Sequence, residues 1–252
     1  MSTPGTEPGT TRDAFLGGRL ILEQPARGYR AGIDPVLLAA SVPATPGQSV
    51  LELGCGVGAA LFCLGARIGG LELTGVELQD GPAELARRNA RTNGIAADIR
   101  CGDLARMPAA LRQKRFDHVI ANPPYFDRRS GTASPRSARE TAIGEAIPLD
   151  GWINHGAKRL VPRGLFTVIQ KADRLPDLLA AMVPRLGSLR VRPVRPRPDR
   201  PAGLVILQGT KGGRAPAVLL PDLILHAAAG TDKSAGFSPV AQAILRDGAQ
   251  IP

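Results

Sequence analysis

The sequence predicts an α/β fold, with a mostly parallel sheet of seven strands and helices on both faces. Three observations predict it. Short apolar segments alternate with helical stretches of about 10–15 residues, which is the pattern of βαβ units and a parallel sheet. The chain of 252 residues is 43% hydrophobic, which is enough for a sizeable core and excludes disorder of the whole chain. No internal repeat divides the chain, and its length suits a single α/β domain.

The N-terminal region precedes this alternation. Residues 1–13 are rich in Thr, Gly and Pro and contain no apolar run, so we expect a disordered leader and no signal peptide. Residues 15–21 are expected to form a short hairpin. Asp34 and Pro35 then open a helix, with Asp34 as its N-cap and Pro35 at its first position.

We expect one domain over residues 14–252. It consists of an N-terminal cap segment over residues 14–47 and a core over residues 48–252. The seven expected strands span residues 49–53, 71–78, 97–101, 116–121, 164–170, 189–194 and 204–208. The expected helices that follow the first, second, fourth and fifth of these strands span residues 59–68, 82–92, 149–160 and 173–186. Asn93-Gly94 stops the helix over 82–92.

Charge and cysteine usage narrow the classes of function. Lys and Arg number 32 against 22 Asp and Glu, so the formal net charge is +10. Such an excess suggests a polyanionic partner, most often nucleic acid, although base composition of the genome also favours Arg over Lys. The three Cys and three His have no metal-ligand spacing, so we expect reduced thiols, no metal and a cytoplasmic protein. No apolar run reaches the ~18 residues that cross a bilayer, so we expect no membrane contact.

Two arginine-rich stretches break the alternation of strands and helices. Residues 127–147 carry four arginines among Ser, Gly and Ala, and residues 190–201 carry five arginines among four prolines. Each stretch is either a solvated loop or a surface for a polyanion.

The strongest local pattern is ELGCGVG over residues 52–58, between a strand and a helix. Its glycines allow a tight turn and a close approach of ligand to backbone at a helix N-terminus. Glu77 ends the next strand, where it can accept hydrogen bonds from both hydroxyls of a ribose. NAD and S-adenosylmethionine both fit these two features.

Two further residues separate the two cofactors. Glu52 precedes the first glycine by two positions, and the resulting E-x-G-x-G-x-G resembles motif I of the class I methyltransferases, which have a Rossmann-like fold. Asp103 follows the third strand, where enzymes of this class bind the amine of the cofactor adenine. The alternative for Glu77 and Asp103 is a turn or N-cap role, and Glu52 either shapes the loop or contacts the ligand.

Asn122-Pro123-Pro124-Tyr125 follows the fourth strand, at the same edge as the glycine turn. An aromatic amine is a poor nucleophile because its lone pair is delocalised into the ring. The side-chain carbonyl of Asn122 and a proline backbone carbonyl can accept both amine hydrogens, and the rigid turn preorganises them. Tyr125 can stack on a flipped-out base, and Phe126 can extend that platform. The tetrapeptide resembles that of methyltransferases that act on adenine N6, guanine N2 or the glutamine amide.

Nearly the whole chain, about residues 15–248, resembles one bacterial family, the tRNA1(Val) adenine N6-methyltransferases. The segments that carry the resemblance are RAGIDPVLLA (30–39), Arg139-Glu140, GLVILQGTKGGR (203–214) and GFSP (236–239). The resemblance implies that Arg30 and Asp34 lie near the cofactor or base and that Lys211 lies near RNA phosphate. It also implies methylation of an adenosine beside the anticodon of a tRNA. No separate RNA-binding domain is present, so the catalytic domain itself must hold the RNA.

The expected site follows from the motifs and this resemblance. The expected catalytic residues are Asn122, Pro123, Pro124 and Tyr125. The expected contacts of S-adenosylmethionine, with S-adenosylhomocysteine as the product, are Arg30, Glu52, Gly54, Cys55, Gly56, Gly58, Glu77, Leu78, Asp103, Leu104 and Asn122. The expected RNA contacts are Asp34, Tyr125, Phe126, Arg128, Arg129, Arg136, Arg139 and Lys211.

Several other functions remain open at this point. A guanine N2-methyltransferase of rRNA uses the same tetrapeptide. A glutamine methyltransferase of proteins also uses it, but usually carries an N-terminal docking domain for which about 45 residues are too few. A nicotinamide oxidoreductase leaves residues 122–125 without a role. A non-catalytic RNA-binding module leaves the intact motifs unexplained.

Overall fold

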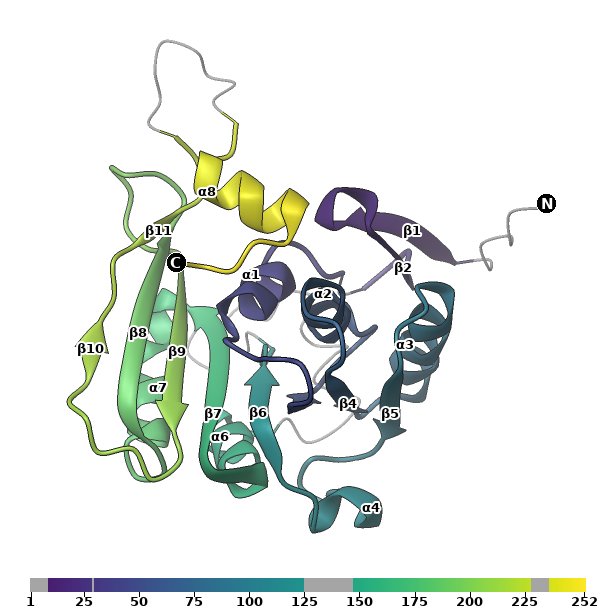
Figure 1. Ribbon diagram of the computed structural model, residues 1–252, viewed down its shortest axis with the longest axis horizontal. Helices are drawn as coiled ribbons and strands as arrows, with labels where there is room; N and C mark the ends of the chain where they lie inside the picture. The colour runs from purple at the N-terminus through teal and green to yellow at the C-terminus, as the bar shows by residue number, and fades with distance from the viewer. Residues whose placement is uncertain (1–8, 29, 125–146, 228–235) are drawn as a thin grey trace, which may run out of the picture.

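The computed structural model describes residues 9–28, 30–124, 147–227 and 236–252 (Figure 1). Its seven long strands are β3 (Ser49–Leu53), β4 (Glu72–Glu77), β5 (Ala97–Cys101), β6 (Phe116–Ala121), β7 (Leu160–Lys171), β8 (Gly187–Arg195) and β9 (Leu204–Thr210). Two strands of two residues each, β10 (Val218–Leu219) and β11 (Leu223–Ile224), pair with β8. The seven strands expected from the sequence are therefore confirmed, and the short edge strands are additions.

The main sheet has the strand order β10-β8-β9-β7-β6-β3-β4-β5. The five strands from β7 to β5 in this order are parallel to their neighbours. β9 is antiparallel to both β7 and β8. The sheet is thus mostly parallel, and β3 lies at the centre of its parallel part.

Helices cover both faces of the sheet because neighbouring strand residues point to opposite sides. Val50 belongs to one hydrophobic cluster and the next residue, Leu51, to the other. The first cluster includes buried residues of α1 (Asp34–Ser41), α2 (Ala59–Arg67) and α3 (Asp80–Thr92). The second includes buried residues of α4 (Ala109–Arg112), α6 (Leu149–Arg159) and α7 (Leu175–Met182). Figure 1 shows α1 and α2 in front of the sheet and α7 behind it.

An N-terminal hairpin packs beside the first layer of helices. Its antiparallel strands are β1 (Thr10–Phe15) and β2 (Leu20–Pro25), joined by a turn at Leu16–Gly18. The expected hairpin at 15–21 is confirmed as the centre of this longer one. The expected leader is wrong for residues 10–13, because their backbone pairs with β2.

The helix termini differ from the expectation in two places. α1 begins at Asp34 with Ile33 in the N-cap position, so the expected N-cap role of Asp34 is wrong. The helix expected over 173–186 is divided into a 3-10 turn at Ala172–Arg174 and α7, because Pro176 favours the start of a new helix.

Near the C-terminus, α8 (Pro239–Gln242) and a π-helical turn at Ala243–Asp247 pack over α1. Among the residues that the structure describes, none of the helices has the length and apolar character that a membrane span requires.

Candidate active site

The carboxyl ends of β6, β3, β4 and β5 lie side by side and carry the predicted motifs. Leu53 ends β3 and pairs with Val76 in β4 and with Ala121 in β6. Because neighbouring strands are about 4.8 Å apart, the positions beyond these pairs form a row along the edge of the sheet. The row consists of Asn122, Gly54, Glu77 and Cys101. The motifs are therefore brought together, as the sequence predicts.

The glycine turn combines internal packing with open space. Gly54, Gly56 and Gly58 have φ angles of 62°, 54° and 88°. A Cβ atom on Gly54 would lie 2.4 Å from the ring of Trp152, and one on Gly58 would lie 2.1 Å from the ring of Phe62. A Cβ atom on Gly56 would meet no atom within 4 Å. The protein's own packing thus requires two of the glycines, while the third leaves room for a ligand against the backbone.

Glu77 is buried beside this turn and connects it to the next loop. Its Oε2 accepts a hydrogen bond from the Gly56 N–H (2.9 Å), and its Oε1 accepts one from the Gln79 N–H (3.0 Å). Its main-chain carbonyl accepts a hydrogen bond from the Gly102 N–H (2.8 Å). Each carboxylate oxygen has a second acceptor position. Glu77 can therefore shape the turn and still accept hydrogen bonds from ligand hydroxyls.

Glu52 lies beneath the turn and is 3% exposed. Its Oε2 accepts a hydrogen bond from the Leu61 N–H in the first turn of α2, at 2.9 Å. Burial raises the pKa of Glu52 well above its usual value, the charge of Glu77 adds to this rise, and the hydrogen bond opposes it. Burial, followed by the charges of Glu52 and Glu77, also raises the pKa of the Cys55 thiol. These contacts favour a loop-shaping role for Glu52.

Asp103 follows β5 in a tight turn. Its Oδ1 accepts a hydrogen bond from the Ala105 N–H at 2.8 Å. Leu104 is 6% exposed and belongs to the second hydrophobic cluster. Leu78 is 50% exposed, directly after Glu77, and so presents an apolar surface at the same edge.

The tetrapeptide begins directly after β6, and a neighbouring strand holds its backbone. Pro123 is buried and Pro124 is exposed. The carbonyl oxygen of Pro123 accepts a hydrogen bond from Nε2 of Gln170 in β7, at 3.2 Å. Gln170 is 1% exposed. The sequence reasoning missed it because no motif marks a single glutamine within a strand.

Six of the predicted residues lie outside the described part of the chain. They are Tyr125, Phe126, Arg128, Arg129, Arg136 and Arg139.

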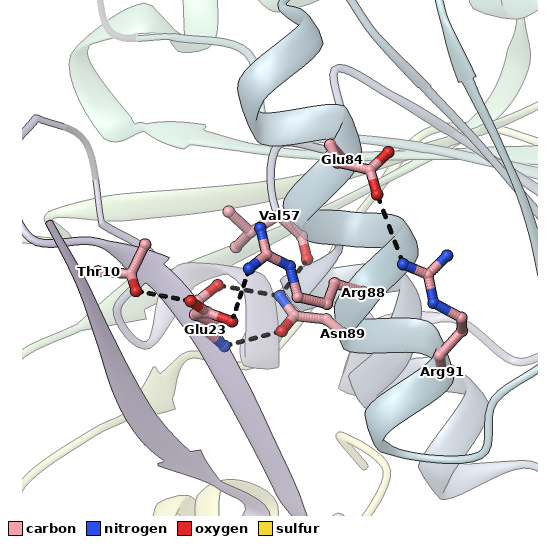
Figure 2. A network of polar contacts seen from close by, with 7 residues as sticks. All are labelled: Thr10, Glu23, Val57, Glu84, Arg88, Asn89 and Arg91. Atoms are coloured by element: carbon pink, nitrogen blue, oxygen red, sulfur yellow. Dashed lines mark hydrogen bonds and ion pairs between the residues drawn. The ribbon is translucent and has the colours of Figure 1, made fainter. Parts of the chain in front are cut away.

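A second missed residue, Asn89 of α3, joins the glycine turn to the hairpin (Figure 2). Its Nδ2 donates to the main-chain carbonyls of Val57 (3.1 Å) and Glu23 (3.0 Å), and its Oδ1 accepts from the Glu23 N–H (2.8 Å). Around it, the Glu23 carboxylate accepts a hydrogen bond from Thr10 and lies 3.6 Å from Arg88. The backbone of the turn is therefore attached to both α3 and the N-terminal hairpin.

Arg30 lies in the segment before α1, and Asp34 is the first residue of α1. Arg30 forms an ion pair with Asp13 of β1, at 2.6 Å. Asp13 also accepts a hydrogen bond from the side-chain Nε2 of Gln24, at 2.9 Å. The side-chain Oε1 of Gln24 in turn accepts a hydrogen bond from the Ala31 N–H. These contacts tie the segment before α1 to the hairpin.

The structure separates Lys211 from the other predicted site residues. Its backbone pairs with Arg163 and Gly164 near the start of β7, at the amino edge of the sheet. The six residues of β6 separate this edge from Asn122 by about 17 Å.

Two arginines of the stretch 190–201 have internal partners. Arg192 donates to the carbonyls of Pro221 and Pro252, and Arg195 forms an ion pair with Asp222 at 2.9 Å. They hold the C-terminal segment against β8.

Within the described ranges, no three His, Cys, Asp or Glu side chains are grouped in a way that could hold a metal ion.

Comparison with known proteins gives one matching family and several relatives. Residues 31–189 match the family described as "Methyltransferase small domain". The tRNA1(Val) (adenine(37)-N6)-methyltransferase of Porphyromonas gingivalis is 31% identical over 232 residues, which is 86% of this chain and 89% of the relative. The protein of the same description from Dickeya chrysanthemi is 29% identical, over 86% of this chain and 87% of the relative.

Two solved structures share the fold. A predicted O-methyltransferase from Agrobacterium tumefaciens aligns with a TM-score of 0.70 and 26% identity, over 86% of this chain and 98% of that protein. A 16S rRNA N2 methyltransferase of T. thermophilus, solved in complex with AdoMet and guanosine, aligns with a TM-score of 0.56 and 21% identity. That alignment covers 80% of this chain and 50% of the other.

Proposed function

The chain belongs to the tRNA1(Val) (adenine(37)-N6)-methyltransferase family, and from this premise we propose that it methylates N6 of adenine 37 in tRNA. The observation that carries the proposal at the level of residues is the row at the carboxyl edge of the sheet. The glycine turn, Glu77, the loop that carries Asp103 and the turn that begins at Asn122 follow adjacent strands. Because the reaction takes place on tRNA, the proposed compartment is the cytoplasm.

The cofactor we propose is S-adenosylmethionine, which fits the row in three ways. The open space above Gly56 admits a ligand against the backbone. Glu77 keeps acceptor positions that suit the two ribose hydroxyls. Asp103 and the exposed Leu78 suit the amine and the apolar face of an adenine.

The reaction requires two hydrogen-bond acceptors at the target amine. S-adenosylmethionine supplies an electrophilic methyl group on a positively charged sulfur. The Asn122 side-chain carbonyl and the Pro123 main-chain carbonyl accept the two amine hydrogens and return lone-pair density to the nitrogen. Gln170 holds the Pro123 carbonyl in place. The amine proton leaves after methyl transfer, so no general base is required.

Base and RNA contacts are assigned to the segment that follows. Tyr125, with Phe126 beside it, is the proposed stacking platform for the flipped-out adenine. Arg128, Arg129, Arg136 and Arg139 are the proposed contacts of nearby phosphates, because they directly follow the tetrapeptide.

The substitution Asn122→Ala tests the mechanism. We expect methyl transfer to fall by at least about 100-fold, the usual scale for losing one such acceptor, while the Kd for S-adenosylhomocysteine stays within about twofold. Radiolabelled transfer to tRNA and calorimetry measure the two quantities. Gln242→Ala, at an exposed position in α8, is the matched control and should keep full activity. Wild-type turnover by the Asn122 variant would exclude the proposed role.

Nucleoside mass spectrometry decides between substrates. Labelled cofactor is incubated with total tRNA, total rRNA and protein extract, and N6-methyladenosine in tRNA is the expected product. N2-methylguanosine in rRNA, or methylglutamine in protein, would replace the proposal with one of the related activities. Binding of NAD in place of S-adenosylhomocysteine would indicate an oxidoreductase, and binding of neither would indicate a non-catalytic module.

A further inference from the structure

Six cationic side chains gather at the amino edge of the sheet, opposite the candidate active site. They come from α4 and the segment after it, the end of α6, the start of β7 and the turn after β9. This amino-edge basic surface consists of Arg112, Lys114, Arg115, Arg159, Arg163 and Lys211. Figure 1 shows α4, the start of β7 and the end of β9 at the same lower end of the sheet.

Hydrogen bonds connect the segments that carry these side chains. Arg159 donates to the main-chain carbonyl of Leu111 at 3.0 Å. Nζ of Lys211 donates to the carbonyl of Leu160 at 2.8 Å. The Arg163 N–H donates to the carbonyl of Lys211 at 3.0 Å. The surface is therefore built from contacts between segments that are far apart in sequence.

Within the part of the chain that the structure describes, none of these six side chains forms an ion pair with Asp or Glu. The carboxylate of nearby Asp117 accepts hydrogen bonds from the N–H and the hydroxyl of Ser49. Burial lowers the pKa of Lys211, and the charges of Arg115 and Arg159 lower it further. An anionic partner would relieve this repulsion.

We propose that the amino-edge basic surface is a second contact site for the phosphate backbone of the RNA substrate. The proposal rests on the proposed function, since it takes RNA as the substrate. Arg112, Arg115 and Arg163 are exposed, and guanidinium groups suit phosphate oxygens.

The location of the surface predicts which RNA can use it. The length of β6 places it about 17 Å from the tetrapeptide. About six base pairs of a nucleic-acid helix span this distance, so the surface is placed to contact the RNA stem rather than the target base. The surface should therefore strengthen binding of tRNA and leave kcat at saturating tRNA unchanged.

The test compares two double variants that each remove two exposed positive charges. Arg115→Gln with Arg163→Gln alters the surface, and Arg91→Gln with Arg246→Gln is the matched control elsewhere. Affinity for full-length tRNA is measured over a series of salt concentrations, together with kcat at saturating tRNA and affinity for S-adenosylhomocysteine. We expect the surface variant to bind tRNA about tenfold more weakly, with a salt slope smaller by about 0.7–0.9 per lost contact. Its kcat at saturating tRNA and its cofactor affinity should equal those of the wild type.

Two outcomes would overturn the proposal: an unchanged tRNA affinity and salt slope, or an equal loss in the control variant. Failure of the proposed function gives a different result, because the wild type would then methylate no tRNA. Direct tRNA binding still tests the surface in that case, and absence of all tRNA binding would overturn both proposals.

Discussion

At the scale of single residues, Gln170 holds from a neighbouring strand the Pro123 carbonyl, which is the proposed acceptor for the target amine. Its side-chain Nε2 donates to the Pro123 carbonyl, and its side-chain Oε1 accepts a hydrogen bond from the Lys171 N–H at 2.9 Å. Both ends of this buried side chain are therefore fixed. A carbonyl aimed in this way costs no reorganisation when the amine arrives.

Replacement of this glutamine by a near-isosteric side chain tests the positioning role. Gln170→Met removes the donor, so we expect kcat to fall by about two- to tenfold, the scale of one hydrogen bond, with an unchanged Kd for S-adenosylhomocysteine. Steady-state kinetics and calorimetry measure these quantities. Gln208→Met is the control, because Gln208 is also buried in this sheet but donates to Ser41 and Thr167. An equal loss of kcat in both variants would reduce the role of Gln170 to stability alone.

The predicted site residues divide according to the range of their contacts. Glu77 and the glycines could be predicted, because their chemistry depends on local sequence next to a strand end. Gln170 could not, because its partner Pro123 lies 47 residues away and the pairing depends on the β6–β7 register. Lys211 was expected near RNA phosphate from resemblance, and the antiparallel direction of β9 places it at the edge of the sheet opposite the tetrapeptide.

At the scale of elements, two asparagines one turn apart bind the N-terminal hairpin to α3. Asn89 lies within the helix, and Asn93 is its C-cap. Asn89 contacts the backbone of Glu23 and Val57. The Oδ1 of Asn93 accepts a hydrogen bond from the Ile21 N–H, and its Nδ2 donates to the Ile21 carbonyl, each at 2.9 Å. Both use the amide to pair with a strand edge, but only Asn89 also reaches the glycine turn.

This difference supplies a matched pair of variants. Asn89→Leu leaves buried backbone groups of Glu23 and Val57 without a partner, so it should destabilise the fold by about 1–3 kcal/mol. Asn93→Leu removes hydrogen bonds to the exposed backbone of Ile21, where water can replace the amide, so its cost should be smaller, about 0.5–1 kcal/mol. Only Asn89→Leu should also weaken binding of S-adenosylhomocysteine, because Val57 lies in the turn. Urea unfolding and calorimetry measure the two effects. Equal cofactor affinity in both variants would show that the turn does not depend on this contact.

The strands and helices of the core were predictable because the spacing of apolar residues indicates which face of each element is buried. Residues 82–92 illustrate this, since their apolar face and the Asn93-Gly94 stop agree with α3. The second role of Asn93 was not predictable, because its partner lies 72 residues away in β2. Residues 10–13 are polar, and pairing with β2 rather than burial makes them a strand.

At the scale of the whole molecule, six of the described cationic side chains gather at the amino edge of the sheet. Composition predicted a polyanionic partner from the net charge of +10. Some of the charged side chains form contacts within the protein, since Arg192 and Arg195 bind the C-terminal segment. The amino-edge basic surface was invisible in the sequence because four separate segments contribute to it.

Stability of the whole fold should depend on the protonation of His118 in β6. This side chain is 6% exposed, and its Nε2 lies 3.0 Å from Oε1 of Gln48. Burial lowers its pKa from 6.5, and the charge of Arg67 adds to this while Asp117 opposes it. The unfolded chain therefore takes up the proton first as the pH falls, so this contribution to stability is full above about pH 6.5 and declines below it.

Urea unfolding at pH 7.5 and pH 5.5 measures this dependence. The wild type should lose more free energy of unfolding between the two values than His118→Gln, which cannot take up the proton. The same loss in both proteins would show that other groups determine the pH dependence.

The strand order also determines when each half of the site can form during synthesis. The row from Gly54 to Asn122 is contiguous in sequence, and its strands β3 to β6 pair only with one another and with β7. Domains generally fold as units and synthesis proceeds from the N-terminus, so the strands of the row leave the ribosome before β7 to β9. Gln170 and Trp152 arrive later, so the Pro123 carbonyl is held only after β7 has joined the sheet. The amine-binding turn can therefore take its final form only when the chain has been made to a point 47 residues beyond Pro123.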